Sequence, residues 1–195
     1  MDVEIAGSIT ELDKTQWDEI AEKHVMSSYG WLKTMEETFV EKTIPQIFFI
    51  TDSKGIVGAS ACYVFNPGRV FANLDHVVFG RLHKLAQKLK LSFLPAMICS
   101  QPFSYGSHFL FRKDLDPEKI RSATNKLFLA IEETAQKKRL PIAFINATVE
   151  EAELDGLLQN SGYQKVLDMP LCYLDIHWNS FNTYKAHLKS VSKHS

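Results

Sequence analysis

The amino-acid sequence predicts an α/β fold with a mixed central sheet and helices on both faces. Two β-rich runs, 46–51 and 56–65, flank a loop of four residues at 52–55, which is typical of a β-hairpin. Residues 116–138 carry apolar residues at helical spacing, and the short apolar run 141–147 indicates a central strand buried on both faces. Because a hairpin is followed by alternating helices and strands, we expect a mixed sheet covered on both sides.

Two helices are expected before the hairpin. Apolar residues recur at helical spacing over 17–24, behind Asp13 or Thr15, either of which has the short polar side chain of an N-cap. A second helix is expected over 28–41, where apolar side chains again share one face. The front of the chain is therefore predicted as helix, helix and hairpin.

A third helix is expected over residues 74–90, capped by Asn73 or Asp75 and slightly weakened by Gly80. Its apolar residues are spaced four, three and four apart: Val78, Leu82, Leu85 and Leu89. The segment 91–100 then reads as a strand interrupted by Pro95, which favours an edge position or a bulge. A polar turn over 101–108 and a further strand over 108–112 follow.

The second half opens with a strong helix start, Asp116-Pro117-Glu118, in which a capping Asp precedes a proline at the first helical position. Residues 148–151, TVEE, have the form of a capping box, and a helix from there is expected to close at Gly162. A strand or bent strand pair over 163–176 and an amphipathic helix over 180–193 complete the predicted order.

Composition bounds the class of protein. The chain has 195 residues and is 45% hydrophobic, as expected of one globular domain or a compact pair. Its net charge is −1, and without a basic surplus nucleic acid is not expected as a partner. Its three cysteines, Cys62, Cys99 and Cys172, lie far apart in apolar runs without metal-ligand spacing, so no metal is expected. The first residues are acidic and polar, and no apolar run has the length of a membrane span, so a cytoplasmic setting is expected.

The order of elements from 116 to 174 resembles the C-terminal half of the GNAT acyltransferase fold. The stretch LLQNSGYQKV at 157–166 is similar to the helix of that superfamily that closes on glycine and an aromatic residue. Two further stretches, HVMSSYGWLKTMEET at 24–38 and SFNTYKAHLKSVSKHS at 180–195, resemble the Fem-type, FemAB-like branch, which places two GNAT-like domains in tandem.

The resemblance implies a GNAT-like mixed sheet and N-acyl transfer from an acyl thioester to a small-molecule or peptide-like amine. Acyl-CoA or acetyl-CoA would be the co-substrate. Residues 1–178 would form the acyltransferase domain, and 179–195 would begin a basic helix or linker toward a second GNAT-like domain, so that the chain is the N-terminal half of an enzyme. The alternative is a non-catalytic GNAT-like module that binds a ligand or a partner domain.

The sequence departs from the GNAT pattern in two places. Many GNATs bind the CoA pyrophosphate with a Q/R-x-x-G-x-G/A loop before a helix, because glycines let backbone N–H groups approach the phosphate. The segment 101–107, QPFSYGS, has one glycine and one proline, and a strand is expected after it. Leu158 stands near the position of the tyrosine that serves many GNATs as general acid. We therefore read 101–108 as a substrate-facing bend or a plain turn, and no catalytic residue is assigned.

Candidate substrate-binding residues lie in that turn and at the start of the second helix. Three hydroxyls and an imidazole gather beside a glycine, and loops at strand ends often carry function, although turns are also rich in Ser and Gly for backbone reasons. Tyr29 and Trp31 would line a groove, with core packing as the alternative for at least one of them. The candidates are Ser104, Tyr105, Gly106, Ser107, His108, Tyr29 and Trp31.

Overall fold

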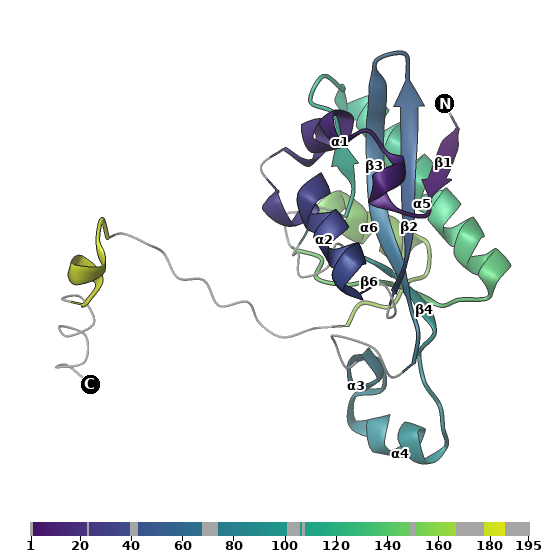
Figure 1. Ribbon diagram of the computed structural model, residues 1–195. Coiled ribbons are helices and arrows are strands. Elements are labelled where there is room, and N and C mark those ends of the chain that lie inside the picture. The colour runs from purple at the N-terminus through teal and green to yellow at the C-terminus, as the bar shows by residue number, and fades with distance from the viewer. Residues whose placement is uncertain are drawn as a thin grey trace.

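The computed structural model describes residues 2–22, 24–39, 43–67, 74–100, 106, 108–148, 151–166 and 178–185. Within these ranges a six-stranded mixed sheet runs in the order β1-β2-β3-β4-β6, with β5 paired to β3 (Figure 1). The strands are β1 (Val3–Ala6), β2 (Thr43–Asp52), β3 (Gly55–Phe65), β4 (Ala96–Cys99), β5 (Leu110–Phe111) and β6 (Ile142–Phe144). The α-helices are α1 (Lys14–Ala21), α2 (Tyr29–Phe39), α3 (Leu74–Phe79), α4 (His83–Lys88), α5 (Pro117–Lys138) and α6 (Ala152–Asn160). Three short 3₁₀ turns are η1 (Ile9–Glu11), η2 (Val25–Ser27) and η3 (Gly80–Leu82).

Helices cover both faces of the sheet, as the sequence predicts. Side chains of a strand alternate between faces, so the neighbours Ile47 and Phe48 of β2 enter different clusters. Trp17 of α1 and Leu32 of α2 share the cluster of Ile47, whereas Leu127 of α5 shares that of Phe48. Figure 1 shows α1 and α2 in front of the sheet and α5 behind it. The α/β class with two helical layers is confirmed.

The hairpin of β2 and β3 is confirmed, and it is longer than predicted. Asp52 pairs with Gly55 across the antiparallel ladder, so two loop residues replace the four that we expected. The Asp52 carboxylate accepts the Lys54 N–H at 2.8 Å, which closes the turn locally. The short strand β1, which the sequence analysis missed, pairs antiparallel with β2.

The predicted helix over 74–90 is interrupted. Gly80 adopts a φ of +49°, a left-handed conformation that glycine reaches without steric cost, and the helix breaks there into α3, η3 and α4. The predicted strand over 91–100 begins only at Ala96, after Pro95, and the strand over 108–112 shortens to β5. Figure 1 shows α3 and α4 beyond the ends of β3 and β4, outside the two helical layers.

The second half follows the predicted order, with one shorter, less buried strand and one shifted helix start. Asp116 caps α5 by accepting the Lys119 N–H at 2.8 Å, and Pro117 opens the helix. The strand predicted over 141–147 is β6, which is the last strand of the sheet order within the described residues and is half-buried, where we expected burial on both faces. Helix α6 begins at Ala152, later than the capping-box pattern indicates.

The remaining C-terminal predictions are tested only in part. Residues 163–166 lie outside any strand, and the rest of the strand predicted over 163–176 falls outside the described residues. Residues 181–185 are helical, and the rest of the helix predicted over 180–193 likewise falls outside them. Among the described residues, no helix combines the length and apolarity that crossing a membrane requires.

Two of the three cysteines are buried free thiols, and the third, Cys172, lies outside the described residues. Cys62 of β3 and Cys99 of β4 stand directly opposite each other in the antiparallel ladder. Burial, together with the neighbouring Cys62 thiol, raises the pKa of Cys99. Their place in the core agrees with their apolar sequence context, because a thiol in such surroundings packs as a small hydrophobe.

Candidate functional site

The carboxyl ends of β4 and β6 bring two turns together. The two strands are parallel, and Cys99 pairs in register with Phe144. The turns that follow them therefore leave the sheet at the same edge, and the Gly106 N–H donates to the Asn146 carbonyl at 2.9 Å across the gap. In open α/β sheets, ligands bind outside the carboxyl ends of strands, which makes this edge the candidate site.

A buried histidine–glutamate pair joins the two turns. The Nδ1 atom of His108 lies 2.9 and 3.0 Å from the carboxylate oxygens of Glu151, and the His108 backbone N–H donates to Oε1 at 3.1 Å. Its Nε2 atom lies 2.8 Å from the Ile145 carbonyl oxygen. The Thr148 N–H donates to the same carboxylate at 3.3 Å. His108 is 1% exposed, so the pair ties the turn after β4 to the turn after β6 from within.

The hydrogen-bond pattern engages both ring nitrogens of His108. A carbonyl oxygen accepts and never donates, so Nε2 of His108 carries a proton. Burial alone would raise the pKa of Glu151, but the hydrogen bonds and charge of His108 and the Thr148 N–H outweigh it, and the net pKa is lowered. The Nδ1 atom faces the Glu151 carboxylate. The geometry is therefore that of a buried histidine–carboxylate pair with both ring nitrogens engaged.

Gly106 allows the two turns to approach closely. Its φ of +69° belongs to the left-handed region, which side chains with a Cβ rarely adopt. A Cβ atom there would also lie 3.3 Å from Thr148 Oγ1 and 3.5 Å from Glu151 Oε2. A glycine is thus required at this position both by its backbone conformation and by the space beside the histidine–carboxylate pair.

An aromatic cluster backs the polar pair. The His108 ring centroid lies 6.0 Å from that of Phe144, which in turn contacts Phe109 at 6.4 Å and Tyr163 edge-on at 5.8 Å. Burial and the nearby Glu132 carboxylate raise the pKa of Tyr163, so its hydroxyl stays protonated. The low-polarity surroundings strengthen the His108–Glu151 attraction and make either partner costly to remove.

The predicted site residues fall into three groups. The structure brings Gly106 and His108 together at the edge described above, with the imidazole pointing inward to Glu151. Tyr29 and Trp31, in the first turn of α2, are half-buried and pack on the core cluster that Ile145 also contacts. Three predicted residues lie outside the described residues: Ser104, Tyr105 and Ser107. Substrate contact by the turn stays a prediction.

Sequence reasoning missed the role of Glu151. The pattern TVEE at 148–151 singled it out as a helix cap, and its carboxylate does accept the Thr148 N–H. Its main partner is His108, 43 positions away, and no local pattern reveals so distant a contact. An acid in a capping position directly after an apolar strand is the signal that was available.

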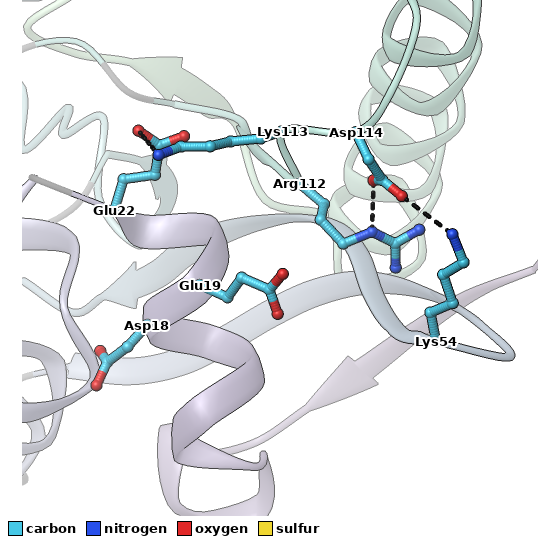
Figure 2. A pocket seen from close by; sticks show the side chains of 7 residues that line it. All are labelled: Asp18, Glu19, Glu22, Lys54, Arg112, Lys113 and Asp114. Atoms are coloured by element: carbon cyan, nitrogen blue, oxygen red, sulfur yellow. Dashed lines mark hydrogen bonds and ion pairs between the residues drawn. The ribbon is translucent and has the colours of Figure 1, made fainter.

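A concave region lies between α1 and the turn after β5 (Figure 2). This pocket of about 480 Å³ is lined by charged residues alone: Asp18, Glu19, Glu22, Lys54, Arg112, Lys113 and Asp114. Figure 2 shows Lys113 extending to Glu22, while Arg112 and Lys54 converge on Asp114.

The pocket charges are largely engaged with one another. Arg112, which is 8% exposed, donates to both carboxylate oxygens of Asp52 at 3.0 and 2.8 Å and to Asp114 at 2.7 Å. The hydrogen bonds from Arg112 lower the pKa of Asp52 to about 2. This network fastens the β2–β3 hairpin to the turn after β5, which is a structural role. The candidate site therefore remains at the ends of β4 and β6.

The described residues were compared with the needs of a metal site. No group of three or more His, Cys, Asp or Glu side chains is placed there to hold a metal ion. A second pocket, of about 380 Å³, lies between α5 and β6 and is lined by Glu132, Ala135, Gln136, Leu140, Ile142 and Tyr163. Most of the segment weighed above as a phosphate loop, 101–107, lies outside the described residues.

Comparison with known proteins supplies the family. A family model described as FemAB-like, peptidoglycan biosynthesis/recognition, matches residues 8–195, which is nearly the whole chain. No curated protein and no solved structure gives a significant match. The match includes both stretches that resemble the Fem-type branch and the two turns of the candidate site. The chain belongs to the FemAB-like family.

Proposed function

We propose that this chain transfers an acyl group from an acyl thioester of the acyl-CoA class to a primary amine on a peptidoglycan precursor. The observation that carries the proposal is the pair of turns locked together by His108 and Glu151 at the carboxyl ends of β4 and β6. The family match supports the peptidoglycan-related substrate class. The element order, with helices on both faces of a mixed sheet, supports a GNAT-like placement of the fold.

The proposed reaction asks the protein for positioning more than for reactive side chains. The amine nitrogen attacks the thioester carbonyl carbon, a C–N bond forms, the C–S bond breaks, and the amine proton is lost as the thiolate leaves. Holding both reactants in line, with backbone donors at the oxyanion, supplies most of the acceleration in such a step. Both nitrogens of His108 are engaged, so its role is to hold the turn rather than to accept the amine proton.

A non-catalytic recognition module is the second candidate. It is favoured by the buried, fully engaged imidazole of His108 and by Leu158, which stands where many GNATs carry a proton-donating tyrosine. The family description names recognition beside biosynthesis. In this case the locked turns would present a rigid surface to a peptidoglycan peptide without any transfer.

The two candidates separate in one experiment. The chain is incubated with acetyl-CoA or a longer acyl-CoA and a peptidoglycan stem peptide that has a free side-chain amine. Thiol release is followed by absorbance and acylated peptide by mass spectrometry, with an amine-blocked peptide as the control. Transfer to the free amine alone supports the enzyme.

Binding is measured in parallel by thermal unfolding. A ligand at ~100 times its Kd stabilises by about 2.7 kcal/mol, or roughly 5–10 °C for a chain of this size. A shift with the peptide but no product supports the recognition module. The absence of both product and shift, with either donor, would overturn both candidates.

The domain division stays a prediction. In that division, residues 1–178 form the transferase domain, and residues 179–195 lead into a second GNAT-like domain of a two-domain enzyme. A version extended by one domain's length should exceed the 195-residue chain in transfer rate, and equal rates would contradict the half-enzyme idea.

A further inference from the structure

Residues 74–91 form a lobe that stands outside both helical layers; we call it the 74–91 lobe (Figure 1). It connects β3 to β4 and contains α3, η3 and α4. Its base is closed by Asp75, which accepts the Ser92 hydroxyl at 3.0 Å and the Phe93 N–H at 2.7 Å. Phe93 and Leu94 then pack on the core, so they anchor the base of the lobe to the sheet.

The lobe exposes an unusual amount of apolar surface. Leu82, Leu85, Leu89 and Leu91 are 64%, 52%, 60% and 54% exposed, while Ala86 is the residue that α4 buries. Leu85 and Leu89 are four positions apart and share a side of the helix. The apolar spacing that normally covers a core here faces outward, and such a patch marks an interaction surface.

The exposed charge of the lobe is positive, although the whole chain carries −1. The described charged residues that are exposed on it are Arg81, Lys84, Lys88 and Lys90. Asp75, its acidic residue, is turned to the base by the bonds to Ser92 and Phe93. Cations therefore flank the leucines without a competing exposed carboxylate on the lobe.

We propose that the 74–91 lobe docks on an anionic phospholipid surface. Exposed leucines flanked by lysine and arginine are the composition of segments that lie in a membrane interface, with the apolar side chains at the acyl boundary and the cations at the headgroups. A second copy of the lobe would bring like charges together, so charge complementarity favours anionic lipid over self-association. At six residues, α4 lies on such a surface rather than crossing it.

The lobe and the candidate site lie at opposite ends of β4. Strand β4 runs from the base of the lobe to the turn that carries Gly106 and His108. Its four residues, Ala96–Cys99, span about 10 Å at the usual rise per residue.

The test is binding of the 195-residue chain to vesicles. Vesicles of equal parts phosphatidylglycerol and phosphatidylcholine are compared with vesicles of phosphatidylcholine alone, by co-sedimentation at low and high salt. We expect binding to the anionic vesicles that weakens as salt rises. Neither acyl donor nor acceptor is present, so the outcome is independent of the proposed transferase activity.

Two variants assign the binding to the lobe. The triple change Leu82→Ser, Leu85→Ser and Leu89→Ser should lower vesicle affinity at least roughly tenfold, because the apolar insertion is lost. The double change Lys84→Gln and Lys88→Gln should lower it roughly 30-fold, at about a fivefold loss per cation. Circular dichroism and melting temperature should be unchanged in both, since the replaced side chains are exposed.

Matched controls change similar residues elsewhere. One control replaces three exposed apolar residues with serine: Val25, Ile44 and Leu129. The other replaces Lys33 and Lys137 with glutamine and so makes the same change in net charge. Both controls should bind as the unmodified chain does.

Four outcomes would overturn the proposal. The first is absence of binding to anionic vesicles, and the second is equal binding to neutral ones. The third is a dimer in sedimentation velocity that the leucine variant dissolves, without vesicle binding, since the leucines would then serve a second copy. Equal loss in the controls and the lobe variants would place any lipid binding elsewhere on the chain and overturn it as well.

Discussion

Removing the carboxylate of Glu151 should destabilise the fold through His108. The carboxylate accepts from two backbone N–H groups and from the His108 ring, and its side chain is 18% exposed while that of His108 is fully buried. Removing one partner of a buried His–carboxylate pair of this kind costs up to about 3–5 kcal/mol, because the buried partner is left unsatisfied. With Glu151 partly exposed, we expect the lower end, about 3 kcal/mol, for Glu151→Ala.

The conservative change Glu151→Gln should cost less, about 1–2 kcal/mol, since the amide keeps one acceptor oxygen. These losses correspond to roughly 6–12 °C in Tm for the alanine variant and 2–8 °C for the glutamine variant. Urea unfolding followed by circular dichroism gives the free energies. Glu153→Gln, an exposed acid in the first turn of the same helix, is the matched control and should lie within about 0.5 kcal/mol of the unmodified chain.

A double-mutant cycle tests the cause. In a His108→Ala background, Glu151→Ala should cost much less, because no buried imidazole is left without its hydrogen-bond partner. Because the pKa of Glu151 is lowered, its contribution is fully present above pH 4.5 and is lost as the pH falls below that value. A cost for Glu151→Ala below about 1 kcal/mol, or equal costs in both backgrounds, would refute the reasoning.

Two further predictions concern a glycine and an arginine. Gly106→Ala should destabilise by about 1–2 kcal/mol, since alanine at a φ of +69° is strained and its Cβ would crowd Thr148; unchanged urea unfolding would contradict this. Arg112→Met should remove the part of the pH dependence of folding stability that comes from Asp52. The pKa of Asp52 is about 2 in the folded chain against an ordinary 3.8. That contribution is present above pH 3.8 and lost as the pH falls through 2, so the stability gap between the unmodified chain and the variant should narrow from pH 5 to 2; a constant gap would argue against it.

Elements governed by neighbouring residues were predictable. Asp116 and Pro117 start α5 because a capping carboxylate and a preset φ act within one turn of helix. The hairpin at 52–55 also forms where the turn residues indicate it. The two helical layers were predictable because apolar residues repeat every 3.6 positions in helices and every 2 in strands. These repeats can be read without knowing which distant segments pair.

Errors arose where the environment of an element decides its form. The spacing of leucines over 74–90 is that of a buried helix face, yet those side chains are exposed, because periodicity reveals that a face is apolar and not what covers it. The run 141–147 is apolar enough for a doubly buried strand, but β6 ends the described sheet order. Strand order is set by pairing between distant segments, which apolar content does not encode.

One part of the candidate site was predictable from the sequence, and the other part depended on the tertiary structure. The turn with Gly106 and His108 stands out in the sequence, since polar residues and a glycine interrupt two apolar runs and local chemistry makes that visible. The partner of His108 was decided by the parallel pairing of β4 and β6, which brings Glu151 from 43 positions away to 2.9 Å. A parallel pair needs a long crossover, here through α5, so residues far apart along the chain meet at one sheet edge only after the sheet has formed.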